Sequence, residues 1–178
     1  MAQPTFPDVW TEADLDTLPD DGHRYEILEG SLLMTPPPGG RHQKAGAELL
    51  FALRTAAPPG WQPLYEIGVR VPRGNFIPDI VVLRPGADLN AIWHDAVDAA
   101  LVVEIASPST ETIDRSSKAI KYAEAQIPSY WRVTLDHTLV VHELTADGYA
   151  VVATVAPGDS WTASRPFEVT VTPADLFD

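Results

Sequence analysis

Two stretches decide the fold: PDIVVLRP, residues 78–85, and ALVVEIASPST, residues 100–110. Their apolar runs are typical of strands that lie inside a protein. Each run nevertheless carries a carboxylate, Asp79 in the first and Glu104, between Val103 and Ile105, in the second. An ionised carboxylate in apolar surroundings is costly unless it is paired, hydrogen-bonded or bound to a metal. These two acids are therefore the first candidates for a functional site.

The segments around the two runs predict an α/β (α+β) domain with a mixed sheet flanked by helices. A hairpin is expected where turn residues separate two alternating segments, and helices where apolar residues recur at helical spacing. The predicted elements are a hairpin over 24–35 with its turn near Glu29-Gly30, a helix over 41–57 with Ala45, Leu49, Ala52 and Leu53 on one face, strands over 61–71, 76–84 and 100–106, and a helix over about 111–125.

The two ends of the chain differ from this centre. Residues 1–21 predict an acidic surface arm with one short helix that Thr11 can cap. Residues 86–96 predict a loop or a short helix, and 133–178 a β-rich extension. Segments 129–135, 138–145 and 149–155 alternate as in an antiparallel meander, and one strand with a short helical end follows. Because no repeat or linker divides residues 1–178, we expect a single domain.

Composition excludes several classes of protein. The 178 residues include no cysteine, which rules out disulfides, thiolate metal sites and a cysteine nucleophile. No stretch approaches the roughly 20 apolar residues of a membrane span. The first ten residues, MAQPTFPDVW, lack the basic and apolar regions of a signal peptide. We therefore expect a cytoplasmic protein without membrane contact.

The formal net charge of −13 argues against strong nonspecific binding to a polyanion. The charge is unevenly spread, however. Thirteen of the 25 acids and one of the 12 bases lie outside residues 22–132, which leaves 12 acids and 11 bases within that range. The centre of the chain is nearly neutral, so nucleic acid is not excluded as a partner.

The two acids can meet if their strands are adjacent and in register. Two carboxylates at close range repel each other unless a cation lies between them. A hard divalent ion such as Mg²⁺, or Mn²⁺, has the required oxygen preference. A helix over 111–125 would add Lys118, which shares one flank with Asp114 and Tyr122, beside an apolar stripe of Ile113, Ile120 and Ile127. The lysine could then lean over the sheet edge, position or help deprotonate a water, and oppose developing charge.

These residues resemble the PD-(D/E)-x-K nuclease superfamily, with its restriction-endonuclease-like core, and within it the Uma-type family of restriction endonucleases, formerly a domain of unknown function. The family's motifs occur in order across roughly residues 24–132. They are YEILEG, the Pro-rich turn and histidine from Pro36 to His42, Pro78-Asp79 with its apolar run, VVEI-SPST, D-R-x-x-K-x-x-x-Y from Asp114 to Tyr122, and P-x-Y-W ending at Trp131.

The resemblance implies a metal-dependent endonuclease in which Asp79 and Glu104 hold Mg²⁺ (or Mn²⁺). One position departs from the superfamily signature, because Ala106 stands where the lysine of D/E-x-K is expected. The resemblance implies that this lysine has moved to the helix as Lys118. We expect nucleic acid, with DNA in first place, as the partner, and a homodimer as one possible assembly.

Other interpretations of the same residues remain open. Asp79 could cap a strand end, and Glu104 could pair with a structural Lys or Arg. Glu26 could be a further metal-proximal carboxylate or an exposed strand acid. His42 is most simply a cap or surface residue, although the family pattern makes it an accessory candidate.

On the helix, Lys121 and Arg115 are most simply solvated, with phosphate contact as the alternative. Tyr122, Tyr130 and Trp131 are typical packing residues. Tyr122 and Asp114 are accessory candidates because they share the flank of Lys118. The rival function is a catalytically silent nuclease-fold domain that serves binding or assembly.

Overall fold

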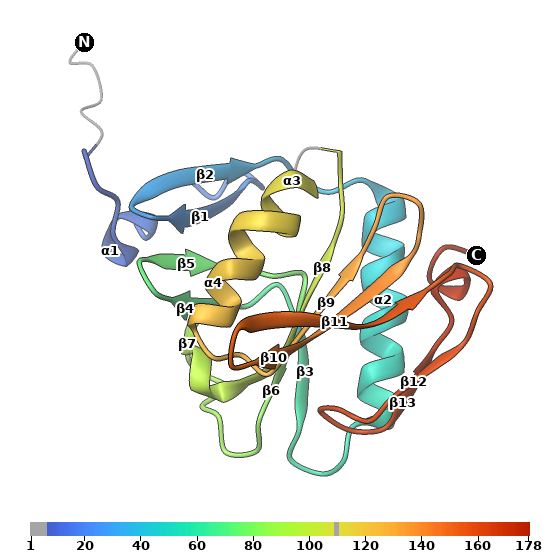
Figure 1. Cartoon of the computed structure of the whole chain (residues 1–178). Helices are drawn as coiled ribbons and strands as arrows, with labels where there is room; N and C mark the ends of the chain where they lie inside the picture. Colours follow the sequence, from blue (N-terminus) through green and yellow to red (C-terminus); the bar gives the residue numbers. More distant parts are fainter. Residues whose placement is uncertain (1–6, 109–110) are drawn as a thin grey trace.

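The computed structural model describes residues 7–108 and 111–178, which fold around a six-stranded mixed sheet (Figure 1). Its strand order is β11-β10-β9-β8-β6-β3. These strands are β3 (Gln62–Tyr65), β6 (Ile80–Leu83), β8 (Ala99–Ile105), β9 (Ser129–Val133), β10 (Leu139–Thr145) and β11 (Gly148–Val155). Strands β8 and β9 run parallel, whereas their other neighbours in this sheet are antiparallel.

A second sheet of the described residues has the order β2-β1-β5-β4-β7. Its strands are β1 (Arg24–Leu28), β2 (Ser31–Thr35), β4 (Gly68–Val71), β5 (Gly74–Phe76) and β7 (Trp93–Asp95). Glu29 and Gly30 form the tight turn between β1 and β2, with φ of 51° and 78°. Two consecutive residues with positive φ are typical of the turn that matches the twist of a hairpin. The predicted hairpin is confirmed.

Helices cover both faces of the six-stranded sheet. Helix α2 (Gly40–Ala56) buries Ala45, Leu49 and Leu53 against the β6, β8 and β9 side chains of one face. On the other face, Tyr122 of α4 (Ala119–Glu124) packs with Phe76 of the second sheet. Every residue of β6, β8 and β9 is buried, which explains why β6 is continuously apolar and why β8 is apolar apart from Glu104. The predicted α+β class with a mixed sheet between helices is confirmed.

The stretch 61–71 is not the single strand expected from its sequence. It forms β3 in one sheet and β4 in the other, and the chain turns between them at Glu66, whose φ is 49°. The Glu66 N–H donates to the Asp79 carbonyl (3.0 Å), which fixes the break beside the start of β6. The prediction was wrong because the alternation of side chains continues through residues 61–71. The break becomes visible only from the different strands with which β3 and β4 pair.

The helix expected over about 111–125 is present, but it is not regular. Helix α3 (Glu111–Ile113) runs into a π-helical turn (Asp114–Lys118) and then into α4. A π turn changes the rotation between the residues before and after it. The predicted apolar stripe is therefore wrong at Ile120, which is 58% exposed, whereas Ile127 is fully buried.

The expected meander after residue 128 is confirmed as β9, β10 and β11, and β10 and β11 extend the central sheet. The tail adds a hairpin that packs beside α2, of which one strand was expected. Its elements are β12 (Trp161–Ala163), β13 (Val169–Val171) and the 3₁₀ helix Pro173–Leu176. The loop 86–96 contains β7, and the 3₁₀ helix Ala96–Asp98 follows it.

The N-terminal segment folds onto the second sheet through the predicted short helix α1 (Glu12–Leu15). Asp14 accepts hydrogen bonds from the backbone and hydroxyl of Thr11, and Glu12 pairs with Arg70 at 2.8 Å. Among the helices of residues 7–108 and 111–178, none is long and apolar enough to cross a membrane.

Candidate active site

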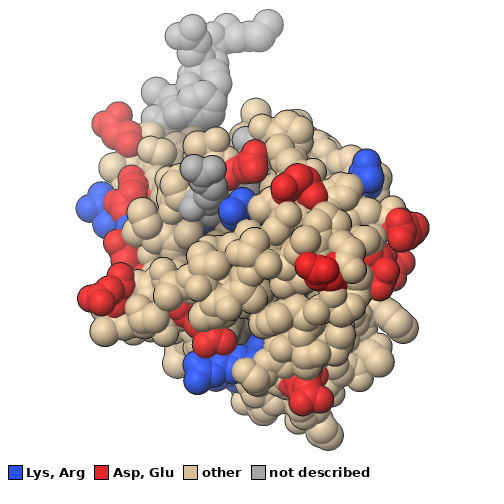
Figure 2. Space-filling view, turned by 45° about the vertical axis from the view of Figure 1, so that its right-hand side comes forward, with Lys and Arg blue, Asp and Glu red and all other residues tan. Residues whose placement is uncertain are grey.

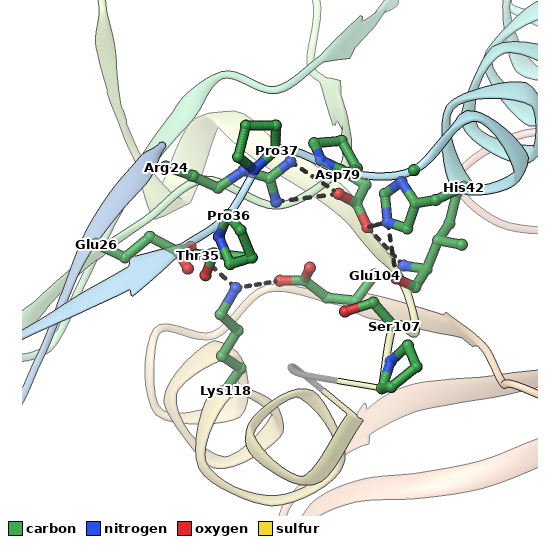
Figure 3. Close-up of a pocket in the computed structure, with 14 residues that line it drawn as sticks. Arg24, Glu26, Thr35, Pro36, Pro37, His42, Asp79, Glu104, Ser107 and Lys118 are labelled. Carbon is green, nitrogen blue, oxygen red and sulfur yellow. Dashed lines mark hydrogen bonds and ion pairs between the residues drawn. The ribbon is translucent and has the colours of Figure 1, made fainter. Parts of the chain in front are cut away.

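Strand pairing brings Asp79 and Glu104 together at the same end of the central strands. Strands β6 and β8 are adjacent, and Ile80 pairs with Val103. Asp79 directly precedes β6, so it lies beside Glu104, and residues that face each other across a pair of strands share one face of the sheet. Both carboxylates, each 2% exposed, line one pocket of about 230 Å³ (Figure 3).

The pocket draws its walls from segments that are far apart in the sequence. Arg24 and Glu26 come from β1, Thr35 ends β2, and the Pro-rich turn 36–39 follows it. The remaining residues come from α2, from the ends of the central strands, and from the loop and helical segment after β8. The full lining is Arg24, Glu26, Thr35, Pro36, Pro37, Pro38, Gly39, His42, Asp79, Glu104, Ile105, Ser107, Pro108 and Lys118.

Lys118 joins two of the carboxylates. It is the last residue of the π turn, and its Nζ lies 2.9 Å from Glu26 Oε1 and 3.1 Å from Glu104 Oε1. The Tyr122 hydroxyl donates to the same Glu104 oxygen (2.7 Å), and the Ile77 N–H donates to Glu26 Oε1 (2.6 Å). Burial and the nearby carboxylates raise the pKa of Tyr122 well above its usual value, so the hydroxyl keeps its proton as a donor.

Asp79 is held by different partners on its two oxygens. Both Nη atoms of Arg24 lie 3.0 Å from Oδ1, while the Ile105 N–H donates to Oδ2 (2.7 Å) and His42 Nε2 lies 3.2 Å from it. Burial by itself raises the pKa of Asp79, but the contacts with His42, Arg24 and the Ile105 amide outweigh it and lower that pKa. The Asp79 carboxylate is therefore ionised.

His42 lies in the first turn of α2 with its ring directed into the site. Its Nε2 lies 2.9 Å from the Ile105 carbonyl oxygen, and because a carbonyl can only accept, Nε2 carries a proton. Burial lowers the pKa of His42, but the hydrogen bond and negative charge of Asp79 outweigh it and raise that pKa. Its Nδ1 is buried and has no hydrogen-bond partner among the described residues.

The structure thus brings Asp79, Glu104, Lys118, Glu26 and His42 into one pocket, with Tyr122 directly behind Glu104. Glu26 is buried and is not the exposed strand acid of the alternative interpretation. His42 contacts the site and is not a surface cap.

Lys121 lies apart from the pocket lining and pairs with Glu29 and Glu124. Phosphate contact by Lys121 or by Arg115 stays a prediction. The side chains of Arg115 and of the accessory candidate Asp114 lie outside the described part of the structure, whereas the Lys121 side chain is placed and ion-paired.

Arg24 was not predicted as a site residue, although it contacts Asp79 directly. A signal was present in the sequence, because Arg24 and Glu26 are two residues apart in a strand and must share a face. The Pro-rich turn 36–39, which the sequence offers only as a motif of the family, forms one wall of the pocket.

The donors of the pocket suit a hard divalent ion in kind, because Glu26, Asp79 and Glu104 offer carboxylate oxygens. Within residues 7–108 and 111–178, however, no three His, Asp or Glu side chains are gathered as a ready-made metal site. Arg24 and Lys118 already contact Asp79 and Glu104. An ion bound by these two acids would compete with both cations for the same carboxylates.

Comparison with known proteins agrees with the resemblance seen in the sequence. The family model described as "Putative restriction endonuclease", Uma2, matches residues 12–174. The chain belongs to the Uma2 family. A comparison with curated protein sequences gives no significant match.

Among solved structures, the Uma2 chain is similar to a crystal structure from Anabaena variabilis that is described as a "putative nuclease belonging to DUF820". The two share 17% sequence identity with a TM-score of 0.74, over 93% of this chain and 96% of the other. At this identity the likeness establishes a common fold.

Proposed function

We propose that this protein is a Mg²⁺- or Mn²⁺-dependent endonuclease that hydrolyses phosphodiester bonds, with DNA as its first expected substrate. The observation that carries the proposal is the pocket in which three buried carboxylates, Glu26, Asp79 and Glu104, meet the buried Lys118. Membership of a family described as a restriction endonuclease supports the same reaction class.

The protein's own groups have separable tasks in this proposal. Asp79 and Glu104 would hold the divalent ion, and a bound ion of this kind lowers the pKa of a coordinated water and offsets charge on a phosphoryl oxygen. Lys118 borders the pocket and donates hydrogen bonds to Glu26 and Glu104, so it can also orient a water and oppose the charge of the transition state.

Other residues keep these groups in place. The Tyr122 hydroxyl fixes Glu104, and the Ile105 N–H fixes one oxygen of Asp79. Pro36, Pro37, Pro38 and Pro108 line the pocket with residues of restricted backbone, which makes these parts of the wall rigid. Such support of the reacting groups is what gives a catalytic site its preorganisation.

Binding of the polymer would depend on local contacts rather than on a broad basic surface. Figure 2 shows acidic side chains scattered over one face of the molecule, with few basic ones between them. Because the salt dependence of nucleic-acid binding grows with the number of neutralised phosphates, we expect a shallow salt slope.

The experiment incubates the purified protein with supercoiled plasmid, single-stranded DNA and RNA, each with Mg²⁺, Mn²⁺ or EDTA. Asp79→Asn and Glu104→Gln are the matched variants, and circular dichroism confirms that each is folded. Metal-dependent cleavage that both substitutions abolish supports the proposal. Equal cleavage by the wild type and the two variants would identify a contaminating nuclease.

A catalytically silent domain is the second candidate. The contacts of Arg24 and Lys118 favour it, because they give all three carboxylates a cationic partner without any metal. Failure of the wild type to cleave any of the three polymers and to bind Mg²⁺ or Mn²⁺ would support this alternative.

A further inference from the structure

Arg24 lies between two hollows of the surface. Its side chain lines the active-site pocket and also a neighbouring pocket of about 360 Å³, and the two pockets share Pro36 and Pro38 as well. The side chain is 16% exposed, so the guanidinium is anchored yet borders open space on both sides. A charged group in this position has room to change partners without any movement of the sheet.

The two oxygens of the Asp79 carboxylate have different partners. Oδ2 is held by the Ile105 amide and His42, which belong to the central sheet and α2. Oδ1 receives both Nη atoms of Arg24 at 3.0 Å. This arrangement is a fork on a single oxygen, and not the pairing of two nitrogens with two oxygens that makes Arg–carboxylate pairs strong. Oδ1 is therefore the oxygen that can be given up.

We propose that Arg24 is a displaceable counter-ion of Asp79 that holds the carboxylate until a divalent ion takes Oδ1, and that its guanidinium then binds a phosphate oxygen of the substrate. This inference rests on the proposed nuclease function and adds a substrate-binding residue to it. Guanidinium groups suit this second task because their planar fork matches the geometry of a phosphate.

Glu66 keeps the guanidinium close to the site during such an exchange. Nη2 of Arg24 bonds to Glu66 in addition to Asp79, and Glu66 is 33% exposed. When the contact with Asp79 opens, this second carboxylate still tethers the group at the border between the two pockets. The Arg24 side chain therefore remains within the lining of the active-site pocket.

The charge balance gives the exchange a direction. Glu26, Glu66, Asp79 and Glu104 have four formal negative charges, and Arg24 and Lys118 have two positive ones, so these six groups together are −2. A divalent ion among them changes the total to 0, which weakens the attraction that holds Arg24 at Asp79 and reduces the repulsion of an anionic phosphodiester. Metal and substrate binding would therefore support each other through Arg24.

The test measures metal binding without nucleic acid, by calorimetry with Mn²⁺, and cleavage in parallel. Arg24→Gln removes the competing charge. Since an adjacent opposite charge changes the proton affinity of a carboxylate by about 10- to 1,000-fold, we expect Mn²⁺ to bind on the order of tenfold more tightly. Cleavage at saturating Mn²⁺ should nevertheless fall on the order of 10²-fold, because a contact with the reacting phosphate is lost.

Two further variants sharpen this test. Arg73→Gln is the matched control, since Arg73 is 76% exposed and pairs with Glu29 outside the pocket, and it should bind Mn²⁺ and cleave as the wild type does. Arg24→Lys keeps the charge but not the fork, so Mn²⁺ affinity should stay near the wild-type value while cleavage falls. This variant also provides the test if Arg24→Gln does not fold.

Tighter Mn²⁺ binding together with slower cleavage for Arg24→Gln supports the inference, because the loss of a purely structural arginine would not raise metal affinity. Unchanged or weaker Mn²⁺ binding, or full cleavage by Arg24→Lys, would overturn it while leaving the nuclease proposal intact. A wild type that neither binds Mn²⁺ nor cleaves would overturn both.

Discussion

Replacing Lys118 with methionine tests whether its ammonium group is the counter-ion of two buried carboxylates. The side chain is 4% exposed, and those of its partners Glu26 and Glu104 are 3% and 2% exposed. Methionine nearly preserves the length and volume of lysine but leaves both carboxylates without this cation. Breaking a buried pair by removing one partner costs about 3–5 kcal/mol, and burial this deep gives solvent little opportunity to screen the loss.

The loss should be visible in thermal melts followed by circular dichroism. In a domain of this size, 1 kcal/mol corresponds to about 2–4 °C, so Lys118→Met should lower the melting temperature by roughly 6–20 °C. Mg²⁺ or Mn²⁺ should recover part of this loss, because a divalent ion can replace the missing charge between the carboxylates. Cleavage should fall on the order of 10²-fold or more, as it does when a preorganised electrostatic group is removed.

Lys121→Met is the matched control on the same helix. Lys121 pairs with Glu29 and Glu124, whose side chains are 43% and 48% exposed, so water compensates much of its loss. Equal melting temperatures for the two variants would refute the assignment of Lys118 as the buried counter-ion. A large loss for Lys118→Met that metal leaves unchanged would refute the idea that an ion binds between its two partners.

Three further predictions follow from the contacts of the site and the sheet. Tyr122→Phe removes the donor to Glu104 and should cost about 1.5–3 kcal/mol of unfolding free energy in urea titrations, and an unchanged midpoint would contradict this role. Lys121→Ala should change substrate affinity or its salt slope while kcat stays near the wild-type value, and a 10²-fold loss of kcat there would reverse the roles of the two lysines. Burial lowers the pKa of His142 although its contact with the Tyr130 carbonyl raises it, so the folded state favours neutral imidazole. Its stabilisation is present above the ordinary histidine pKa of about 6.5 and is lost as pH falls through the lower folded value. Between about pH 7 and 5, His142→Gln should therefore lose less melting temperature than the wild type, and parallel curves would contradict the assignment.

The central strands could be predicted because burial on both faces leaves a strong mark on a sequence. Strands β6 and β8 lie between α2 and α4, and their apolar runs have few other structural explanations. The same burial made Asp79 and Glu104 conspicuous, since each interrupts a setting that excludes unpaired charge. Lys118 could be placed near them from helical spacing combined with the family pattern.

The remaining features depend on contacts between residues that are distant in sequence. Arg24 and Asp79 are 55 residues apart, and only the packing of the second sheet beside the first brings them together. The exposure of Ile120 depends on the π turn, because a helical wheel with a constant rotation per residue does not account for such a turn. The break at Glu66 likewise reflects the need to enter a different sheet, and the residue that takes the positive φ there is neither Gly nor Asn, so the turn is hard to locate from the sequence.

The charge arrangement of the pocket connects stability with the proposed chemistry. Three carboxylates could not remain buried together in the protein without cations, and Arg24 and Lys118 supply these from two different elements, β1 and the π turn. The two cations are not equivalent, however. Lys118 is almost completely buried between two acids, whereas Arg24 borders two pockets and has an exposed second partner in Glu66. A divalent ion would therefore displace Arg24 more readily than Lys118. The lysine would stay beside the reacting groups, and the arginine would become available to a phosphate.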